Sequence, residues 1–151
     1  MGASLVYKVH KEIMKIISNS EKQTFKIANE FAKKLSGGEV LCLLGDLGAG
    51  KTAFIKGLAS GLGVKNIITS PTFVLMKVYE GKNKIILSHI DAYRLDSGAE
   101  LQYIGADEYL NDSNCITAIE WADRVKDIWP KNKILIKFKI LEGNKREINI
   151  T

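Results

Sequence analysis

One stretch, residues 40–62, constrains this chain more than any other, because an apolar run, a glycine-rich turn and an amphipathic segment follow one another there without a gap. The run Val40–Leu44 has the composition of a buried strand. The letters that follow, GDLGAGKT at 45–52, fit the pattern G-x-x-x-x-G-K-[ST]. Between a strand and a helix, this pattern surrounds phosphate groups with backbone N–H groups at the positive end of the helix dipole. The stretch therefore predicts a binding loop for a nucleoside triphosphate.

The side chains of this loop have separate expected roles. The Lys51 amine is expected to reach the β- and γ-phosphates, and the Thr52 hydroxyl to take one coordination position on the accompanying Mg²⁺. A glycine-rich turn that carries Lys-Thr by chance is the alternative, and the strand and helix on either side argue against it. The residues of the loop predicted to bind the nucleotide are Asp46, Leu47, Gly48, Ala49, Gly50, Lys51, Thr52 and Ala53.

Composition restricts the class of protein. With 151 residues, of which 46% are hydrophobic and 26% charged, the chain has the length and balance of one globular domain. We assign residues 14–151 to that domain and residues 1–13 to an N-terminal leader or extension. The sequence has no apolar stretch near the roughly 18 residues of a membrane-spanning helix and no secretory signal pattern, so we expect a cytoplasmic protein without membrane association.

Cysteine usage and charge exclude two further classes of site. Cys42 and Cys115 each lie within an apolar run and lack metal-ligand spacing, which predicts buried free thiols in a reducing compartment. The lysines are dispersed along the chain, which has a formal net charge of +5. Neither an arginine-rich block nor interleaved aromatic residues suggest a nucleic-acid surface, so a solvated lysine-rich surface is the preferred interpretation.

Helix and strand patterns alternate along the rest of the chain. Ser20 and Gln23 form a capping-box pattern, and the apolar spacing after them predicts a helix over 21–36 that stops at Gly37 and Gly38. Turn chemistry and alternating apolar residues predict two hairpins and two single strands. The predicted strands, besides that at 40–44, lie at 15–18, 74–79, 84–90, 115–119, 134–141 and 146–150. The sum is an α/β, P-loop NTPase-like domain of three layers whose sheet is partly parallel and partly antiparallel.

Two acids follow buried strands directly. Asp91 closes the run IILSHI, and Glu120 closes CITAI. Ligands of α/β sheets gather outside the carboxyl ends of the strands, so either carboxylate could hold the metal or orient an attacking water. Each acid could instead cap the turn that follows it. We therefore predict Lys51, Asp91 and Glu120 as the catalytic residues, and Thr52 and Glu120 as metal ligands, with the main acid left open.

Other residues near these strands have weaker signals. The segment Ser70–Phe73 occupies the position of a loop that senses the γ-phosphate in other phosphate-loop proteins, although a plain proline turn explains it equally. His89 has no second metal ligand nearby in sequence and is interpreted as structural. Trp121 could stack on a ligand or belong to the core. Arg94 and Arg124 could clamp a phosphoryl group or form surface ion pairs.

Four motifs together resemble those of the TsaE family, which is the ATPase of the bacterial machinery that makes threonylcarbamoyladenosine in tRNA. They are GDLGAGKT at 45–52, SPTF at 70–73, H-x-D-x-YRL at 89–95 and IEW at 119–121. The resemblance implies binding of ATP and Mg²⁺ by a P-loop fold, with Thr52 and Glu120 at the metal and Asp91 close to it. It also implies action with TsaD and TsaB, with tRNA reached through their complex.

The resemblance assigns two further nucleotide contacts. Arg146 matches an arginine that follows the last turn of family members, although Asn144 and Lys145 lengthen the spacing here. Glu21 matches the segment on the adenine side of the nucleotide. The segment IEWADRV at 119–125 lacks the proline that follows the tryptophan in many members, which affects the next turn more than the chemistry.

Two other functions compete with an ATPase that is slow without its partners. A small-molecule or nucleotide kinase would share the loop and the metal, but it needs an acceptor pocket and usually an arginine-bearing lid. A GTP-dependent switch commonly carries Asn-Lys-x-Asp after a strand. Asn132 and Lys133 are followed by Ile134 and Leu135, so the acid of that motif is missing and ATP is favoured.

Overall fold

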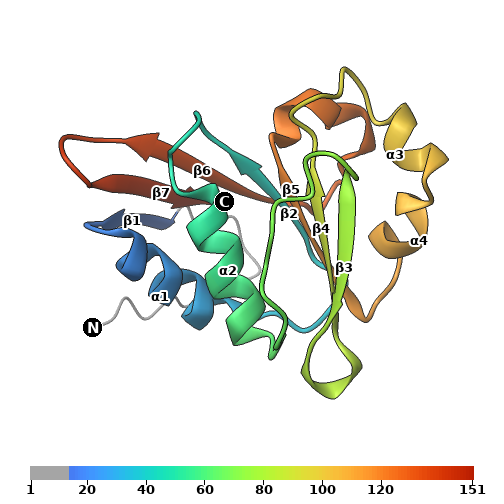
Figure 1. Cartoon of the computed structure of the whole chain (residues 1–151), viewed down its shortest axis with the longest axis horizontal. Helices are drawn as coiled ribbons and strands as arrows, with labels where there is room; N and C mark the ends of the chain where they lie inside the picture. Colours follow the sequence, from blue (N-terminus) through green and yellow to red (C-terminus); the bar gives the residue numbers. More distant parts are fainter. Residues whose placement is uncertain (1–13) are drawn as a thin grey trace.

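The structure, a computed structural model, describes residues 14–151, and the predicted leader at 1–13 lies outside them. Their strands form one seven-stranded sheet in the order β1-β7-β6-β2-β5-β4-β3 (Figure 1). The strands are β1 (Met14–Ser18), β2 (Val40–Leu44), β3 (Met76–Glu80), β4 (Ile86–Asp91), β5 (Cys115–Glu120), β6 (Ile134–Ile140) and β7 (Arg146–Ile150). The helices are α1 (Glu21–Ala32), α2 (Lys51–Gly61), α3 (Ala99–Tyr103) and α4 (Ala106–Leu110), with 3₁₀ segments η1 (Lys82–Lys84) and η2 (Ala122–Ile128).

The sheet is parallel at its centre and antiparallel at both edges. Strands β6, β2, β5 and β4 run parallel to one another, whereas β7 pairs antiparallel with β6 and β1, and β3 pairs antiparallel with β4. Both predicted hairpins are therefore present. Because side chains alternate along a strand, the two middle strands β2 and β5 bury side chains on both faces of the sheet. The predicted α/β fold with a mixed sheet is confirmed.

Helices cover the two faces of the sheet and complete the three layers. One core cluster joins α1 and α2 to the row that contains Leu41, Leu43 and Ala118. The other joins α3, α4 and η2 to the row that contains Cys42 and Ile119. Figure 1 shows α1 and α2 packed side by side, with α3 and α4 at the far edge of the molecule. The buried rows of β2 and β5 therefore divide between these two clusters, and the site described below lies on the face of the first.

Three predicted boundaries were wrong by two or more residues. The strand predicted at 84–90 begins at Ile86, because the 3₁₀ segment η1 occupies Lys82–Lys84. The first helix ends at Ala32 rather than at residue 36, because Lys34 and Leu35 donate to the carbonyl groups of Phe31 and Ala32 in a tighter final turn. Leu35 still packs on the core. The apolar spacing in the sequence therefore extends beyond the last residue of the helix. The strand predicted at 74–79 begins at Met76, since the preceding loop turns back on itself through a hydrogen bond from the Leu75 N–H to the Pro71 carbonyl.

Helices α1 and α2 approach each other closely at two glycines. A Cβ atom at Gly57 would overlap the Phe25 carbonyl oxygen, and one at Gly61 would lie 2.5 Å from the Asn29 carbonyl oxygen. The two glycines are one helical turn apart and form a smooth strip along α2. This contact fixes the axis of α2 against α1, and with it the position of the loop that precedes α2.

The two cysteines are free and buried, as predicted. Burial raises the pKa of the Cys42 thiol to about 12, which keeps it protonated and unreactive at neutral pH. No helix within residues 14–151 is long and apolar enough to cross a membrane.

The glycine contact leads to a stability prediction. Gly57→Ala should lower the free energy of unfolding by about 1–3 kcal/mol, because the added methyl group forces α2 away from α1. Alanine is otherwise the better helix former, so a loss would report the packing alone. Urea unfolding followed by circular dichroism measures the change, with Lys56→Ala on the exposed side of the same helix as the control. Equal or higher stability of Gly57→Ala would contradict the close approach.

Candidate nucleotide site

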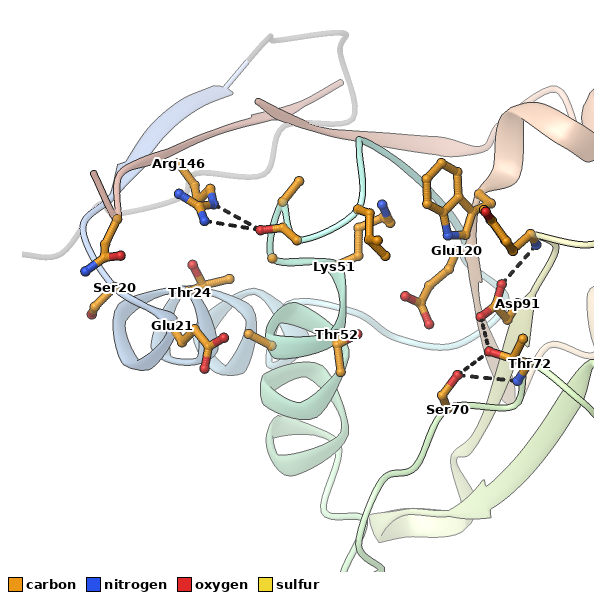
Figure 2. Close-up of a pocket in the computed structure, with 18 residues that line it drawn as sticks. Ser20, Glu21, Thr24, Lys51, Thr52, Ser70, Thr72, Asp91, Glu120 and Arg146 are labelled. Atoms are coloured by element: carbon orange, nitrogen blue, oxygen red, sulfur yellow. Dashed lines mark hydrogen bonds between the residues drawn. The ribbon is translucent and has the colours of Figure 1, made fainter. Parts of the chain in front are cut away.

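A cavity of about 620 Å³ opens where β2, β4 and β5 end and α2 begins. Figure 2 shows two groups of side chains on either side of the glycine-rich loop. Ser20, Glu21, Thr24 and Arg146 lie at one end, and Ser70, Thr72, Asp91 and Glu120 at the other. The remaining lining residues are Leu47, Gly48, Ala49, Gly50, Lys51, Thr52, Ala53, Tyr93, Trp121 and Asn144.

The loop backbone leaves the centre of the cavity open. Gly48 and Gly50 have φ values of 80° and 107°, which other residues rarely adopt, and no atom lies within 4 Å of a Cβ placed at Gly48. Gly50 is the N-cap of α2, and the first backbone N–H groups of a helix have no partner within the helix. The loop thus presents donors and the positive end of a helix dipole to whatever occupies the cavity.

Lys51 is buried at the start of α2 and contacts the loop that precedes it. Its Nζ donates to the carbonyl oxygens of Gly45 and, at 3.0 Å, of Asp46, and it lies 4.0 Å from the centre of the Trp121 ring. Burial lowers the pKa of Lys51, while the negative charges of Glu120 and then Asp46 oppose that shift. Lys51 therefore places a positive charge at the start of α2, where it favours an anionic ligand in the cavity.

Asp91 is held by two hydrogen bonds, one to each carboxylate oxygen. The backbone N–H of Tyr93 donates to Oδ1 at 2.9 Å, and the Thr72 hydroxyl donates to Oδ2 at 2.9 Å. Thr72 in turn shares a 2.6 Å hydrogen bond with the Ser70 hydroxyl. The loop that carries Ser70 and Thr72 is therefore attached to a strand-end acid inside the cavity, as Figure 2 shows.

Glu120 lies level with Asp91, because the two residues are paired in the register of β5 and β4. Its Oε2 is 2.7 Å from Nε2 of His89, and both side chains are buried. Both residues, like Asp91, point to the face of the sheet that α1 and α2 cover, since they continue the rows of Ala118 and Leu87. The two acids thus share one wall of the cavity with the start of α2.

Aromatic rings connect this wall to Lys51. Trp121 has a φ of 55°, a left-handed conformation that is uncommon outside glycine, and its ring lies 5.0 Å from that of Tyr93. The ring also packs on the second core cluster. Trp121 therefore both lines the cavity and extends the core.

At the opposite end of the cavity, residues from the start of α1 lie near Arg146, the first residue of β7. The Arg146 side chain donates to the Gly48 carbonyl oxygen from Nε at 3.3 Å and from Nη2 at 3.2 Å. Thr24 is 2% exposed, and its hydroxyl is 2.6 Å from that of Ser18. This end of the cavity therefore offers the Thr24 hydroxyl and the Glu21 carboxylate next to the phosphate loop.

The residues present fit a magnesium nucleotide. Thr52, Asp91 and Glu120 supply the hard oxygen atoms that Mg²⁺ prefers, and the open backbone at Gly48 leaves room for phosphate. Residues 14–151 contain no group of three or more His, Cys, Asp or Glu side chains able to hold a metal by themselves. Such a group is not needed, since Mg²⁺ is commonly held by one or two carboxylates together with phosphate oxygens.

Comparison with known proteins identifies the family. The family model described as "Threonylcarbamoyl adenosine biosynthesis protein TsaE" matches residues 18–148. The chain belongs to the TsaE family. Its relatives named tRNA threonylcarbamoyladenosine biosynthesis protein TsaE include one from Aquifex aeolicus, 43% identical over 143 residues, covering 92% of this chain and 97% of the relative. Another, from Treponema pallidum, is 39% identical over 137 residues, covering 91% and 99%.

A solved structure is similar in fold. The crystal structure of Bacillus subtilis YdiB aligns with a TM-score of 0.77 and 33% sequence identity, over 92% of this chain and 84% of that chain. A relative named tRNA threonylcarbamoyladenosine biosynthesis protein TsaE from Bacillus subtilis is 40% identical over 126 residues, covering 83% of this chain and 75% of the relative.

The structure brings nearly all predicted site residues into one cavity. Asp46 is the exception, since it contributes its carbonyl oxygen to Lys51 and does not line the cavity. Arg94 and Arg124 instead stack on aromatic rings, at 4.5 Å from Phe73 and 5.4 Å from Tyr93. Sequence reasoning treated His89 as an isolated structural residue and missed its contact with Glu120. No local pattern could have shown this contact, because the pair is 31 positions apart.

Proposed function

We propose that this protein binds ATP with Mg²⁺ and hydrolyses ATP to ADP and phosphate, as a component of the machinery that makes threonylcarbamoyladenosine in tRNA. The observation that carries the proposal is the single cavity in which Lys51 and Thr52 of the phosphate loop meet the strand-end acids Asp91 and Glu120. Family membership supports the biological context, because the relatives are named for threonylcarbamoyladenosine biosynthesis. Cytoplasmic tRNA modification also agrees with two free buried thiols.

The residues have distinct roles in this proposal. Phosphoryl transfer depends mainly on positioning and on stabilising charge, so few groups need to react. Lys51 and the loop N–H groups bind the phosphates, and Thr52 and Glu120 hold the Mg²⁺, which neutralises phosphate charge when bound. Asp91 lies beside Glu120, and hydrogen bonds join it to the loop that carries Ser70 and Thr72. Asp91 can therefore couple the position of that loop to the bound ligand.

The placement of the arginines supports a slow reaction in the isolated protein. An arginine on the transferring phosphoryl group can be worth about 10³ to 10⁵ in rate. The chain has three arginines, of which Arg94 and Arg124 stack on aromatic rings and Arg146 binds the Gly48 carbonyl oxygen. The resemblance to the TsaE family implies action with TsaD and TsaB, so we include them in the proposal as the partners that complete or order the site, with tRNA reached through them.

Substitution of the loop side chains tests nucleotide binding. Lys51→Ala and Thr52→Ala are each expected to weaken Mg²⁺–ATP binding by at least about tenfold, since each removes a charged or metal-directed contact. Isothermal titration calorimetry measures the affinity, and circular dichroism verifies that the domain remains folded. Lys56→Ala, in the same helix but outside the cavity, is the matched control. Unchanged affinity in both variants would remove this loop from the site.

Substitution of Glu120 separates binding from turnover. Glu120→Gln should bind ATP within a few-fold of the parent, because the loop supplies most phosphate contacts, and should lose about 10²- to 10³-fold in kcat. Asp91→Asn serves as the comparison, since both of its carboxylate oxygens already have protein partners. Turnover of Glu120→Gln at the parent rate, with loss in Asp91→Asn, would make Asp91 the main acid instead.

The partner proposal is tested by steady-state ATPase rates. The isolated protein is expected to turn over slowly, and addition of TsaD and TsaB together should raise the rate, with tRNA added in a third series. The two partners without this protein provide the background rate. A rate typical of a free-standing kinase that TsaD and TsaB leave unchanged would contradict the proposal and favour the kinase alternative, which a screen of phosphate acceptors would then examine.

A further inference from the structure

The contact between His89 and Glu120 is not used by the roles assigned so far. Nε2 of His89 lies 2.7 Å from Oε2 of Glu120, and the two side chains are 1% and 7% exposed. The pair spans two neighbouring strands: His89 lies opposite Ala118 in the register of β4 and β5, two residues before the pair of Asp91 and Glu120. The small Ala118 side chain leaves the space beneath Glu120 for the imidazole ring.

The contact has a defined direction. A carboxylate oxygen accepts hydrogen bonds and a ring N–H donates them, so we assign Nε2 of His89 as the donor in this contact. The other ring nitrogen, Nδ1, is buried and has no hydrogen-bond partner among residues 14–151. The polar atoms of the ring therefore have Glu120 as their one partner in the described chain.

The two acids of the cavity differ in how many of their carboxylate oxygens accept a hydrogen bond from the protein. Both oxygens of Asp91 accept hydrogen bonds, one from the Tyr93 N–H and one from the Thr72 hydroxyl. Glu120 accepts at Oε2 alone, and Oε1 has no hydrogen-bond partner within residues 14–151. A glutamate left free to rotate would lose rotamer entropy on being fixed at a ligand. One hydrogen bond from a buried ring removes that freedom before the ligand arrives.

We propose that His89 is a positioning residue that fixes the carboxylate of Glu120 through Oε2 and so leaves Oε1 directed at the ligand in the cavity. The inference rests on the proposed function, because it assigns Glu120, rather than Asp91, as the acid that acts on the magnesium nucleotide. His89 acts through Glu120 and itself touches no ligand. It therefore contributes to turnover more than to nucleotide affinity.

The contact itself is tested without nucleotide by NMR. The chain contains two histidines, His10 and His89, so ¹⁵N-histidine labelling gives few signals, and those absent in His89→Gln belong to His89. A protonated Nε2, and a shift of its proton signal in Glu120→Ala, are expected. A spectrum of His89 that is unchanged in Glu120→Ala would overturn the inference whether or not the protein hydrolyses ATP.

Kinetics then test what the contact does. Glutamine can place an amide N–H near the position of Nε2, whereas leucine cannot donate. His89→Leu is expected to lose about 10- to 100-fold in kcat, as is typical for partners of a ligating carboxylate, with KM within about threefold. His89→Gln should recover most of kcat. Ser88→Ala is the matched control, because Ser88 is buried on the same strand, its hydroxyl has no partner in the described chain, and it points to the other face.

A double variant separates positioning from a general loss of structure. In the Glu120→Ala background, His89→Leu should cause no further loss of kcat, since the group through which it acts is gone. A further loss of the same size, or full activity of His89→Leu alone, would overturn the inference. Thermal unfolding of each variant identifies any that fails to fold, and His89→Gln with the NMR comparison then carries the test. If the parent protein shows no ATPase activity, the proposed function fails while the NMR result still decides the contact.

Discussion

The register of the parallel strands β2, β5 and β4 is the constraint on which the site depends. Leu43 lies opposite Glu120, and Glu120 lies opposite Asp91, so the three strands end at nearly the same level. Because side chains alternate along each strand, both acids point to the face that carries α1 and α2. Helix α2 follows β2 through the phosphate loop, so its N-terminus lies at the same edge. A shift of one residue in either pairing would move an acid to the other face.

Burial makes this arrangement costly unless each charge has a partner, and the structure provides one for each. Lys51 has two carbonyl oxygens and the face of Trp121, Asp91 has two donors, and Glu120 has His89. An isolated charge in such a place would cost several kcal/mol, and these contacts reduce that cost. The partners also fix geometry, so the groups stand in place before any ligand binds. The same contacts therefore serve both the stability of the fold and the chemistry of the cavity.

Local sequence patterns were sufficient for most of the fold and for the loop. The glycine-rich pattern at 45–52 and the strand-end positions of Asp91 and Glu120 depend on neighbours in sequence, and these predictions agree with where the residues lie. The predicted end of α1 was wrong, because Leu35 continues the apolar spacing although the backbone hydrogen bonds there already span three residues instead of four. His89 was misjudged for another reason, since its contact depends on which strands become neighbours, and that order is set by the whole sheet.

The sheet order also bears on how the protein is made. Strand β1 has β7 as its only neighbour in the described sheet, although the two are the first and last of its strands in sequence. During synthesis from the N-terminus, β1 leaves the ribosome early and stays unpaired until β7 has been translated. Arg146, the first residue of β7, reaches Gly48 of the phosphate loop across 98 positions. The nascent chain can therefore form the central parallel strands before the wall around the loop is closed by the last strand to emerge.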